Sequence, residues 1–447
     1  MTDVLLYLLG ILIIVVGLAV SIGLHEAGHL IPAKLFGVKV TQYMIGFGKT
    51  LWSRRRGETE YGVKAIPLGG YVAMIGMYPP AKSGATPRES TTGFLNTMVQ
   101  EGREASAETI GEGDDARTFY RLPMWKKIVI MLGGPFMNLV LAFVFFGIVL
   151  TGFGIPQYTT TVGAVSECLI PATSDATECT ANDPAAPGAE AGLVPGDRIV
   201  SVDGTAMTSW QQVRDTVSAA PGRALTVLIE RGGPDGATAQ QTLTVTPAET
   251  QRVALDANGR VLRGADGEPL LETAGMIGIS PTSEITQQPI TAVPAFVGDN
   301  VASVTQIILH LPQRMVDVWN AAFGPEERQV DGPISVVGVG RLAGEIVSMD
   351  QAPVAAKAQT MFGLLGSLNV ALFVFNLVPL MPLDGGHIAG ALYEGLKRGW
   401  AKLRRRPDPG PIDTAKMVPV TFVVVIVLGA MSLLLMYADI VKPISLG

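Results

Sequence analysis

The chain has 447 residues, of which 48% are hydrophobic and only 16% are charged, and its mean hydropathy is +0.36. Because soluble globular proteins carry about 25% charged residues, this composition favours a membrane protein. The net charge of −6 gives no support to a nucleic-acid-binding role, and the 52 glycines and 30 prolines argue against a coiled coil.

Four apolar segments are each close to the ~20 residues that a helix needs to cross a bilayer. They are residues 4–24, 128–150, 361–383 and 418–437. The first lacks the basic leader and the cleavage site of a signal peptide, so we expect it to be retained. The predicted fold class is an α-helical polytopic membrane protein with about four transmembrane helices and an inserted extracytoplasmic β-rich domain.

The charge pattern along the chain predicts its orientation in a cell membrane. Residues 30–127 carry 14 Lys and Arg against 9 Asp and Glu, residues 151–360 carry 11 against 23, and residues 391–417 carry 7 against 3. Cytoplasmic loops are enriched in Lys and Arg. We therefore expect 30–127 and 391–417 to be cytoplasmic, and 151–360 and both termini to be extracytoplasmic.

The first transmembrane helix, assigned to residues 1–33, ends in His25-Glu26-Ala27-Gly28-His29. Histidines four residues apart share one face of a helix and can hold one zinc ion, beside which Glu26 can act as a general base. A zinc ion there would activate a water for attack on a carbonyl. The alternative is that the two histidines are only polar side chains at the end of a helix. Polar groups at membrane depth are costly, however, unless they face protein, water or a metal.

Residues 34–127 are expected to be a cytoplasmic, membrane-associated segment. Alternating apolar stretches at 61–66 and 71–75, separated by Pro67-Leu68-Gly69-Gly70, predict a hairpin close to the membrane. Residues 79–118 are rich in Pro, Gly, Ser and acidic residues, which predicts a disordered loop.

After the second transmembrane helix, at 128–150, residues 160–283 are expected to form a compact extracytoplasmic β domain. Its pattern predicts a turn, strand and turn at 192–204, a short helix at 210–219, and strands at 225–230 and 241–246. Cys168 and Cys179 lie in this region, and their spacing leaves open both a disulfide and two free thiols. Residues 290–350 are expected to form amphipathic helices.

The third transmembrane segment, at 361–390, contains Leu383-Asp384-Gly385-Gly386-His387. A catalytic zinc needs three protein ligands and one open position. Asp384 is the leading third ligand and His387 its competitor, and spacing alone leaves both open. A basic cytoplasmic loop at 391–417 and a fourth transmembrane helix at 418–437 complete the chain.

Prolines interrupt the third segment just before Asp384. Pro379 and Pro382 cannot continue a regular helix, and a helix break at membrane depth indicates a polar chamber. Asn376 could hydrogen-bond a substrate backbone or a developing oxyanion, and a bond to a neighbouring helix is an equal alternative.

Together these motifs resemble the site-2 proteases, the M50-like intramembrane zinc metalloproteases, of the regulator-of-sigma-factor type with a single PDZ domain. The 192–204 stretch is similar to the core of a PDZ domain. The other matching motifs are His25-Glu-Ala-Gly-His29, Pro67-Leu-Gly-Gly-Tyr71, Gly134-Pro-Phe-Met-Asn138, Gly332-Pro-Ile334 and Asn376 to His387.

The resemblance implies that His25, His29 and Asp384 hold one zinc ion, with Glu26 as the general base. It implies hydrolysis of a peptide bond in a transmembrane segment. Expected substrates are single-span membrane proteins such as anti-sigma factors, trimmed beforehand by a site-1-type protease, and remnant signal peptides. An unwound substrate could add as a strand to the hairpin near 61–76. The candidate substrate-binding residues are Asn376, Gly70, Pro379 and Pro382.

Two departures from the family limit what the resemblance implies about substrates. The best-known proteobacterial relatives carry two PDZ domains, and the insertion at 79–118 has no family role. We interpret the PDZ-like domain as a size filter, with a receptor for peptide C-termini as the alternative. The alternative function is a non-catalytic membrane scaffold or metal-binding adaptor, against which the intact Glu26 argues.

Overall fold

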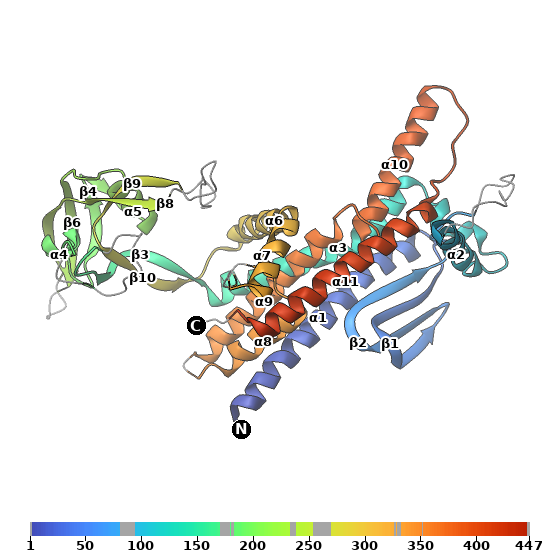
Figure 1. The fold of residues 1–447 in the computed structure, drawn as a ribbon, viewed down its shortest axis with the longest axis horizontal. Coiled ribbons are helices and arrows are strands. Elements are labelled where there is room, and N and C mark those ends of the chain that lie inside the picture. The colour runs from blue at the N-terminus through green and yellow to red at the C-terminus, as the bar shows by residue number, and fades with distance from the viewer. Residues whose placement is uncertain are drawn as a thin grey trace. The chain divides into compact units, whose positions relative to one another are not determined.

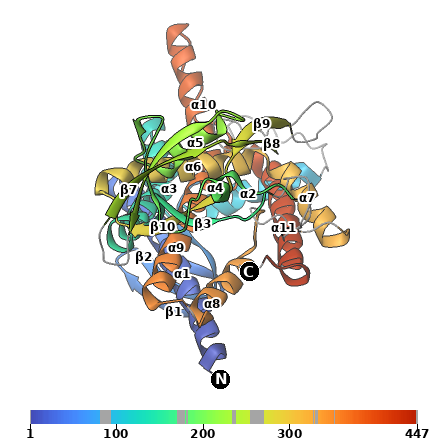
Figure 2. The ribbon, with the colours of Figure 1, turned by 90° about the vertical axis from the view of Figure 1, so that its left-hand side faces the viewer.

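The computed structural model describes residues 2–80, 94–169, 179, 183–232, 238–253, 270–325, 328, 332–350 and 352–444. The chain divides into two compact units, Met1–Phe153 with Pro289–Gly447 and Gly154–Gln288 (Figures 1 and 2). The first is mainly helical and the second mainly β, and each is described by itself below.

The described part of the helical unit contains the helices α1 (Thr2–Leu35), α2 (Phe94–Glu108), α3 (Met124–Gly147, continued by a π-helical turn to Phe153), α6 (Val293–Leu309), α7 (Leu311–Phe323), α8 (Val336–Ser348), α9 (Val354–Asn376), α10 (Asp384–Leu403) and α11 (Val418–Val441). Five segments among the described residues are long and apolar enough to cross a membrane: Asp3–Leu35, Met124–Phe153, Ile290–Leu309, Val354–Asn376 and Thr414–Val441. These helices are those of a multi-pass membrane protein. The extra candidate is α6, the least apolar of the five, which lies in the region expected to be amphipathic.

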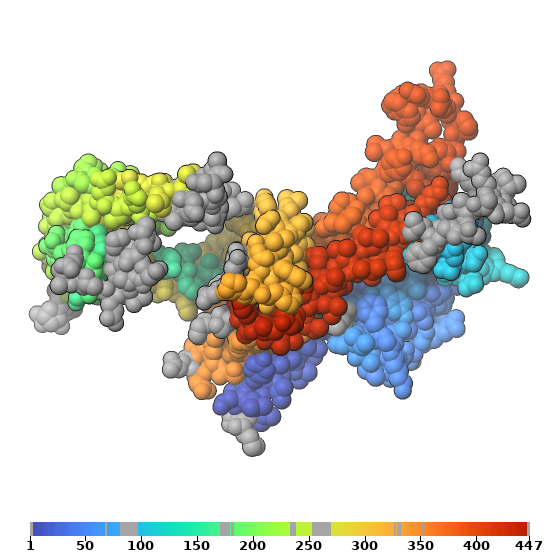
Figure 3. Space-filling view, viewed as in Figure 1, coloured from blue at the N-terminus to red at the C-terminus, as the bar shows by residue number. Residues whose placement is uncertain are grey.

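Helix α1 packs against α3 and α8, and α3 in turn packs against α9 and α10. The α1–α3 contact is a close approach of two backbones, because a Cβ atom on Gly28 would lie 2.2 Å from the carbonyl oxygen of Gly133. Small residues at such crossings are typical of helices packed in lipid, where burial of apolar side chains gives little driving force. Helix α11 lies along the outside of this unit, and most of its apolar side chains are exposed (Figure 3).

Strands β1 (Val40–Arg56) and β2 (Thr59–Met74) form an antiparallel hairpin that turns at Gly57 and Glu58. The strands bend, so that β1 lies between two parts of β2: Met44 is opposite both Gly62 and Tyr71. The sequence analysis placed the separation between the strands at 67–70, which is wrong. These residues lie inside β2, where Gly69 takes a φ of +135° in the bent strand.

The prediction of a disordered loop at 79–118 is wrong for the part that the structure describes. Residues 94–108 form α2, and residues 81–93 lie outside the described residues. The backbone N–H of Tyr78 donates to Ser106 Oγ over 3.0 Å, and Arg103 forms an ion pair with Asp413. Composition did not reveal this helix, because contacts with distant segments hold it in place.

The turn between α9 and α10 separates what was expected to be one interrupted segment at 361–390. Helix α9 begins at Val354 and ends at Asn376, and α10 begins at Asp384 and continues to Leu403. Residues 391–403, expected to belong to a loop, are therefore helical.

The β-rich unit contains β3 (Ile155–Val165), β4 (Arg198–Val202), β5 (Thr205–Ala206), β6 (Leu225–Gly232), β7 (Thr238–Val245), β8 (Ala248–Val253), β9 (Leu271–Met276) and β10 (Ile279–Thr286), with helices α4 (Pro187–Glu190) and α5 (Trp210–Ser218). The main sheet is antiparallel, in the order β10-β3-β4-β6-β7, with β5 paired to β4, and β8 and β9 form a separate ribbon. A disulfide joins Cys168 to Cys179.

The core of this unit is aliphatic. Ile199, Leu225 and Ile229 are at most 1% exposed and pack with Val213 of α5 and Val162 of β3. The expected helix at 210–219 and the expected strands at 225–230 and 241–246 correspond to α5, β6 and β7, which supply six of the thirteen buried residues of this core.

Candidate metal centre

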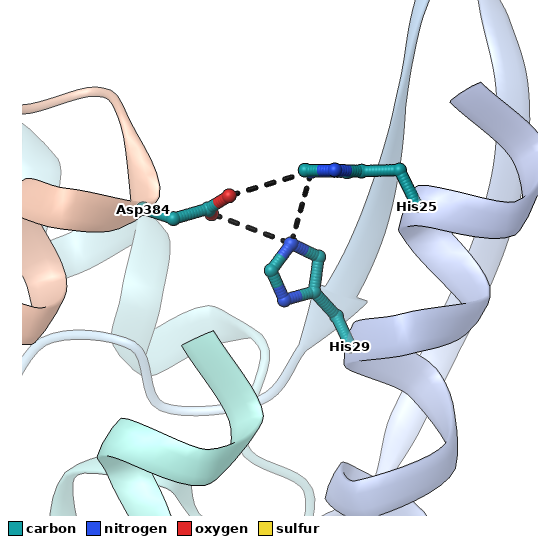
Figure 4. A group of neighbouring side chains, drawn as sticks. All are labelled: His25, His29 and Asp384. Atoms are coloured by element: carbon teal, nitrogen blue, oxygen red, sulfur yellow. Dashed lines mark hydrogen bonds and ion pairs between the residues drawn. The ribbon is translucent and has the colours of Figure 1, made fainter. Parts of the chain in front are cut away.

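Three potential metal ligands meet between α1 and α10. His25 and His29 lie one turn apart on α1, and Asp384 is the first residue of α10 (Figure 4). Asp384 Oδ2 lies 3.3 Å from His25 Nε2, Asp384 Oδ1 lies 3.3 Å from His29 Nε2, and the two Nε2 atoms are 3.2 Å apart. One ligand atom from each residue lies within 4.8 Å of the others, a grouping that can hold one metal ion.

Helix α3 orients the histidine rings through contacts with their Nδ1 atoms. His29 Nδ1 lies 2.8 Å from the carbonyl oxygen of Ile130, an acceptor, so Nδ1 carries the proton and donates it. His29 Nε2 is then left with a free lone pair that points toward Asp384. A metal-binding histidine typically donates its second ring N–H in this way, so His29 suits a metal ligand.

His25 has a comparable partner in Asn138. The Asn138 side chain is fully buried, its amide lies 3.0 Å from His25 Nδ1, and its Oδ1 atom has no hydrogen-bond partner. The two ends of an amide side chain have the same shape and are exchanged by a flip of the group. With the two exchanged, Oδ1 accepts the Nδ1 proton of His25, and Nε2 is free to bind a metal. The buried, unpartnered oxygen therefore fits a metal-loaded His25.

The imidazole rings lie directly on the backbone of α3. A Cβ atom on Gly134 would be 2.2 Å from His29 Nε2 and 2.8 Å from His25 Cε1. Any side chain at this position would displace both rings. Gly134 therefore forms part of the floor of the site, as do Ile130 and Asn138 on the same helix.

Glu26 lies next to His25 on α1 and is 9% exposed. A Cβ atom on Gly70 would be 2.9 Å from Glu26 Cγ and 3.0 Å from the carbonyl oxygen of Met44. Strand β2 therefore runs past Glu26, and the missing side chain of Gly70 makes this approach feasible. The structure brings Gly70, Glu26 and the two histidines into one region.

The turn between α9 and α10 fixes the start of α10. A Cβ atom on Gly385 would lie 2.3 Å from the carbonyl oxygen of Val378, and one on Gly386 would lie 2.5 Å from Met381 N. The turn therefore folds tightly onto the first residues of α10 and determines where Asp384 lies.

Three other predicted site residues precede Asp384 in the chain. Asn376 is the last residue of α9, and Pro379 and Pro382 belong to the turn. The cluster found among the described residues contains Asp384 and not His387.

Sequence reasoning gave no role to Ile130 or Asn138, the residues that orient the histidines. Ile130 acts through its backbone carbonyl, which no sequence pattern reveals. Asn138 did leave a signal, because a polar amide within the apolar segment 128–150 requires a partner.

The sequence was compared with protein families and curated proteins. The profile of peptidase family M50 matches residues 13–406. The zinc metalloprotease Rip1 of Mycolicibacterium smegmatis is 33% identical over 98% of both chains, and Rip1 of Mycobacterium tuberculosis H37Rv is 31% identical over 99% of both. The metalloprotease MmpA of Caulobacter vibrioides is 29% identical over 88% of this chain and 89% of its own.

The family match covers α1, α3 and the start of α10, and so all three potential ligands. Two of these relatives cover nearly the whole chain and are named as zinc metalloproteases. The chain therefore belongs to peptidase family M50, the site-2 protease family, and is a membrane-embedded zinc metalloprotease.

Proposed function

We propose that this protease cleaves a peptide bond within, or at the edge of, a transmembrane segment of its substrate. One observation carries the proposal: two histidines on α1, a helix apolar enough to span a bilayer, meet a carboxylate from α10. Polar groups at membrane depth cost free energy and are usually retained for a function, and metal-dependent hydrolysis is such a function.

His25, His29 and Asp384 are the proposed zinc ligands and Glu26 is the proposed general base. Zinc held by three protein ligands supplies a Lewis acid and an activated water. Glu26 accepts the proton released during attack and returns it to the leaving amine. The Ile130 carbonyl keeps the Nδ1 proton of His29 in place, so that the imidazole presents Nε2 to the site.

Strand β2 is the proposed docking edge for the unwound substrate. Residues 70–74 pair with β1 along one side, and Gly70 lies against Glu26. A substrate segment added along the other side would satisfy its backbone hydrogen bonds and bring its peptide close to Glu26. Asn376, Pro379 and Pro382 precede Asp384 and are proposed to contact the same segment.

The proposed substrates are single-span membrane proteins such as anti-sigma factors, trimmed first by a site-1-type protease, and remnant signal peptides. The β-rich unit acts in this proposal as an extracytoplasmic PDZ-like size filter over 160–283. The acidic charge of 151–360 supports that side of the membrane, as does the disulfide between Cys168 and Cys179.

The proposed topology has four crossings, with α6 outside the bilayer. If α6 does not cross, residues 151–360 remain on one side and the basic regions 30–127 and 391–417 both face the cytoplasm. The zinc ligands then lie near the cytoplasmic ends of α1 and α9.

The deciding experiment compares wild type with Glu26→Gln in cleavage of a single-span substrate in detergent or nanodiscs, with bound zinc measured in both. We expect equal zinc and a rate lower by about 10²–10⁴-fold, the usual contribution of a general acid–base group. Asp384→Asn serves as the reference that loses zinc. Cleavage by Glu26→Gln at the wild-type rate would refute the assignment of the base.

A further inference from the structure

A buried ion pair joins α3 to α10 away from the metal cluster. Lys127 Nζ lies 2.8 Å from Glu394 Oε2, and the two side chains are only 7% and 4% exposed. Removing two charges from water costs free energy that their attraction often fails to recover. Because such a pair often adds little stability, its role is better sought in the way that it fixes the position of one helix on the other.

Glu394 connects three parts of the helical unit. Besides Lys127 of α3, its carboxylate meets Arg398 Nη2 of α10 at 3.1 Å and accepts a hydrogen bond of 3.3 Å from the backbone N–H of Ile412, in the segment before α11. The next residue, Gly395, packs against the Met124 side chain at the start of α3. Helices α3 and α10 are thus in close contact around Glu394 and Gly395, and the ion pair fixes how they are placed on each other.

The ion pair joins two helices that also contribute to the metal site, α3 through its contacts with the histidines and α10 through Asp384. On α3, Lys127 precedes by one turn Ile130, whose carbonyl orients His29. On α10, Glu394 follows Asp384 by ten residues, about 15 Å along a helix with a rise of 1.5 Å per residue. Because a helix is stiff over this length, fixing Glu394 against α3 also fixes Asp384 relative to the helix that holds the imidazoles.

The three proposed ligands are positioned in different ways. His25 and His29 belong to α1, which meets α3 through the backbones of Gly28 and Gly133. Asp384 belongs to α10, and its distance to the histidines depends on how α10 lies against α3. Among the residues that the structure describes, Lys127 and Glu394 form a buried ion pair between these two helices.

We propose that Lys127 and Glu394 are positioning residues that set the register of α10 on α3 and thereby hold Asp384 at its place in the zinc site. The proposal rests on the ligand set of the proposed function. It implies that loss of the pair weakens zinc binding by more than the accompanying loss of stability explains.

The test measures zinc affinity of the full-length protein in nanodiscs by chelator competition, with the thermal midpoint recorded in parallel. We expect Glu394→Gln and Lys127→Met to weaken zinc binding about 10-fold, the lower end of what loss of a group supporting a metal ligand costs. Asp439→Asn is the matched control. Asp439 pairs with Arg328, and both are equally buried at 3% and 4%, but this pair joins α11 to the segment before α8. It should lower the thermal midpoint and leave zinc affinity unchanged.

A double variant, Lys127→Met with Glu394→Leu, keeps the test decisive if a single variant folds poorly. Apolar replacement of a buried pair usually maintains stability. We expect the double variant to recover the thermal midpoint but to retain weakened zinc binding, because an apolar contact does not fix the register.

Two results would overturn the proposal: a double variant with wild-type zinc affinity, or equal weakening of zinc binding by Glu394→Gln and Asp439→Asn. Asp384→Asn separates this failure from that of the proposed function. If that variant keeps wild-type zinc affinity, the ligand set itself is wrong.

Discussion

The two units of this protein use their apolar side chains in opposite ways. In the β-rich unit, Leu225 and Ile229 are at most 1% exposed and form an aliphatic core. In the helical unit, Val423, Ile426 and Leu433 of α11 are more than half exposed. Water drives the first arrangement through the hydrophobic effect, whereas lipid, being as apolar as these side chains, leaves the second open.

The interior of the helical unit is correspondingly rich in glycine and polar contacts. Gly28 and Gly133 bring backbones together, and the fully buried Asn369 donates to Ser21 Oγ over 3.0 Å. Buried polar residues therefore have different roles in the two units. In the helical unit, Asn138 lies against the metal site, whereas the buried Asp197 of the β-rich unit secures a turn.

The largest effect on stability is expected from a cavity in the β-rich core. Ile229→Ala removes a side chain with 0% exposure, which should cost that unit about 4 kcal/mol, within the range for such cavities. Hydrogen exchange of the full-length protein would report the loss in β6 and its neighbours, while bound zinc stays at the wild-type level.

Ile285→Ala is the matched control, because Ile285 lies in the same unit and is 66% exposed. It should change exchange little. Equal effects of the two substitutions would mean that the aliphatic cluster does not hold this unit together.

The next largest effect is expected where two helix backbones touch and leave no room for an added methyl group. Gly28→Ala places a Cβ 2.2 Å from the carbonyl oxygen of Gly133. We expect a cost of about 2 kcal/mol, since overpacking outweighs the gain in helix propensity. Bound zinc should fall as well, because α1 carries both histidines.

Gly429→Ala offers the same substitution in α11, at a position where a Cβ meets no atom within 4 Å. Thermal unfolding in nanodiscs and zinc content should match the wild type there. If Gly28→Ala is equally silent, the close α1–α3 contact does not position the site.

The sequence predicted those features of the site that depend on one helix. The spacing of His25 and His29 places both on one face of α1, and the structure shows them side by side. It could not decide between Asp384 and His387, because that depends on how the α9–α10 turn folds onto Gly385. Contacts between distant segments, such as that of Asn138 with His25, have no periodicity to reveal them.

The predictions of where the hairpin turns and of a disordered loop in place of α2 were wrong for related reasons. Pro67 to Gly70 resembles a turn, but β2 continues through these residues and bends where Gly69 takes a φ of +135°. Helix α2 is polar in composition, so its composition did not distinguish it from a loop. Hydrogen bonds that Ser106 and Thr109 accept from the segment after β2 stabilise it. In the β-rich unit, where water imposes strict alternation, the expected strands and helix matched the structure closely.

The smallest of these effects concerns the buried carboxylate of the β-rich unit. Burial alone would raise the pKa of Asp197, but the Arg231 guanidinium at 2.7 Å and the backbone N–H of Val194 outweigh it and hold the pKa below its ordinary value. A carboxyl with a lowered pKa in the folded state contributes stability above the unfolded pKa of about 3.9 and loses that contribution as pH falls through the folded value.

Asp197→Asn should therefore destabilise the β-rich unit by about 1–2 kcal/mol at pH 7, and the difference from the wild type should shrink below about pH 4. Urea unfolding of the full-length protein at both pH values, followed by exchange in β4, measures it. Glu230→Gln, which breaks the more exposed pair with Arg198, is the control and should change less at pH 7. A difference for Asp197→Asn that stays constant with pH would show that its hydrogen bonds matter and its charge does not. Asp197 would then act as Asn138 and Asn369 of the helical unit do, through hydrogen bonds that need no charge.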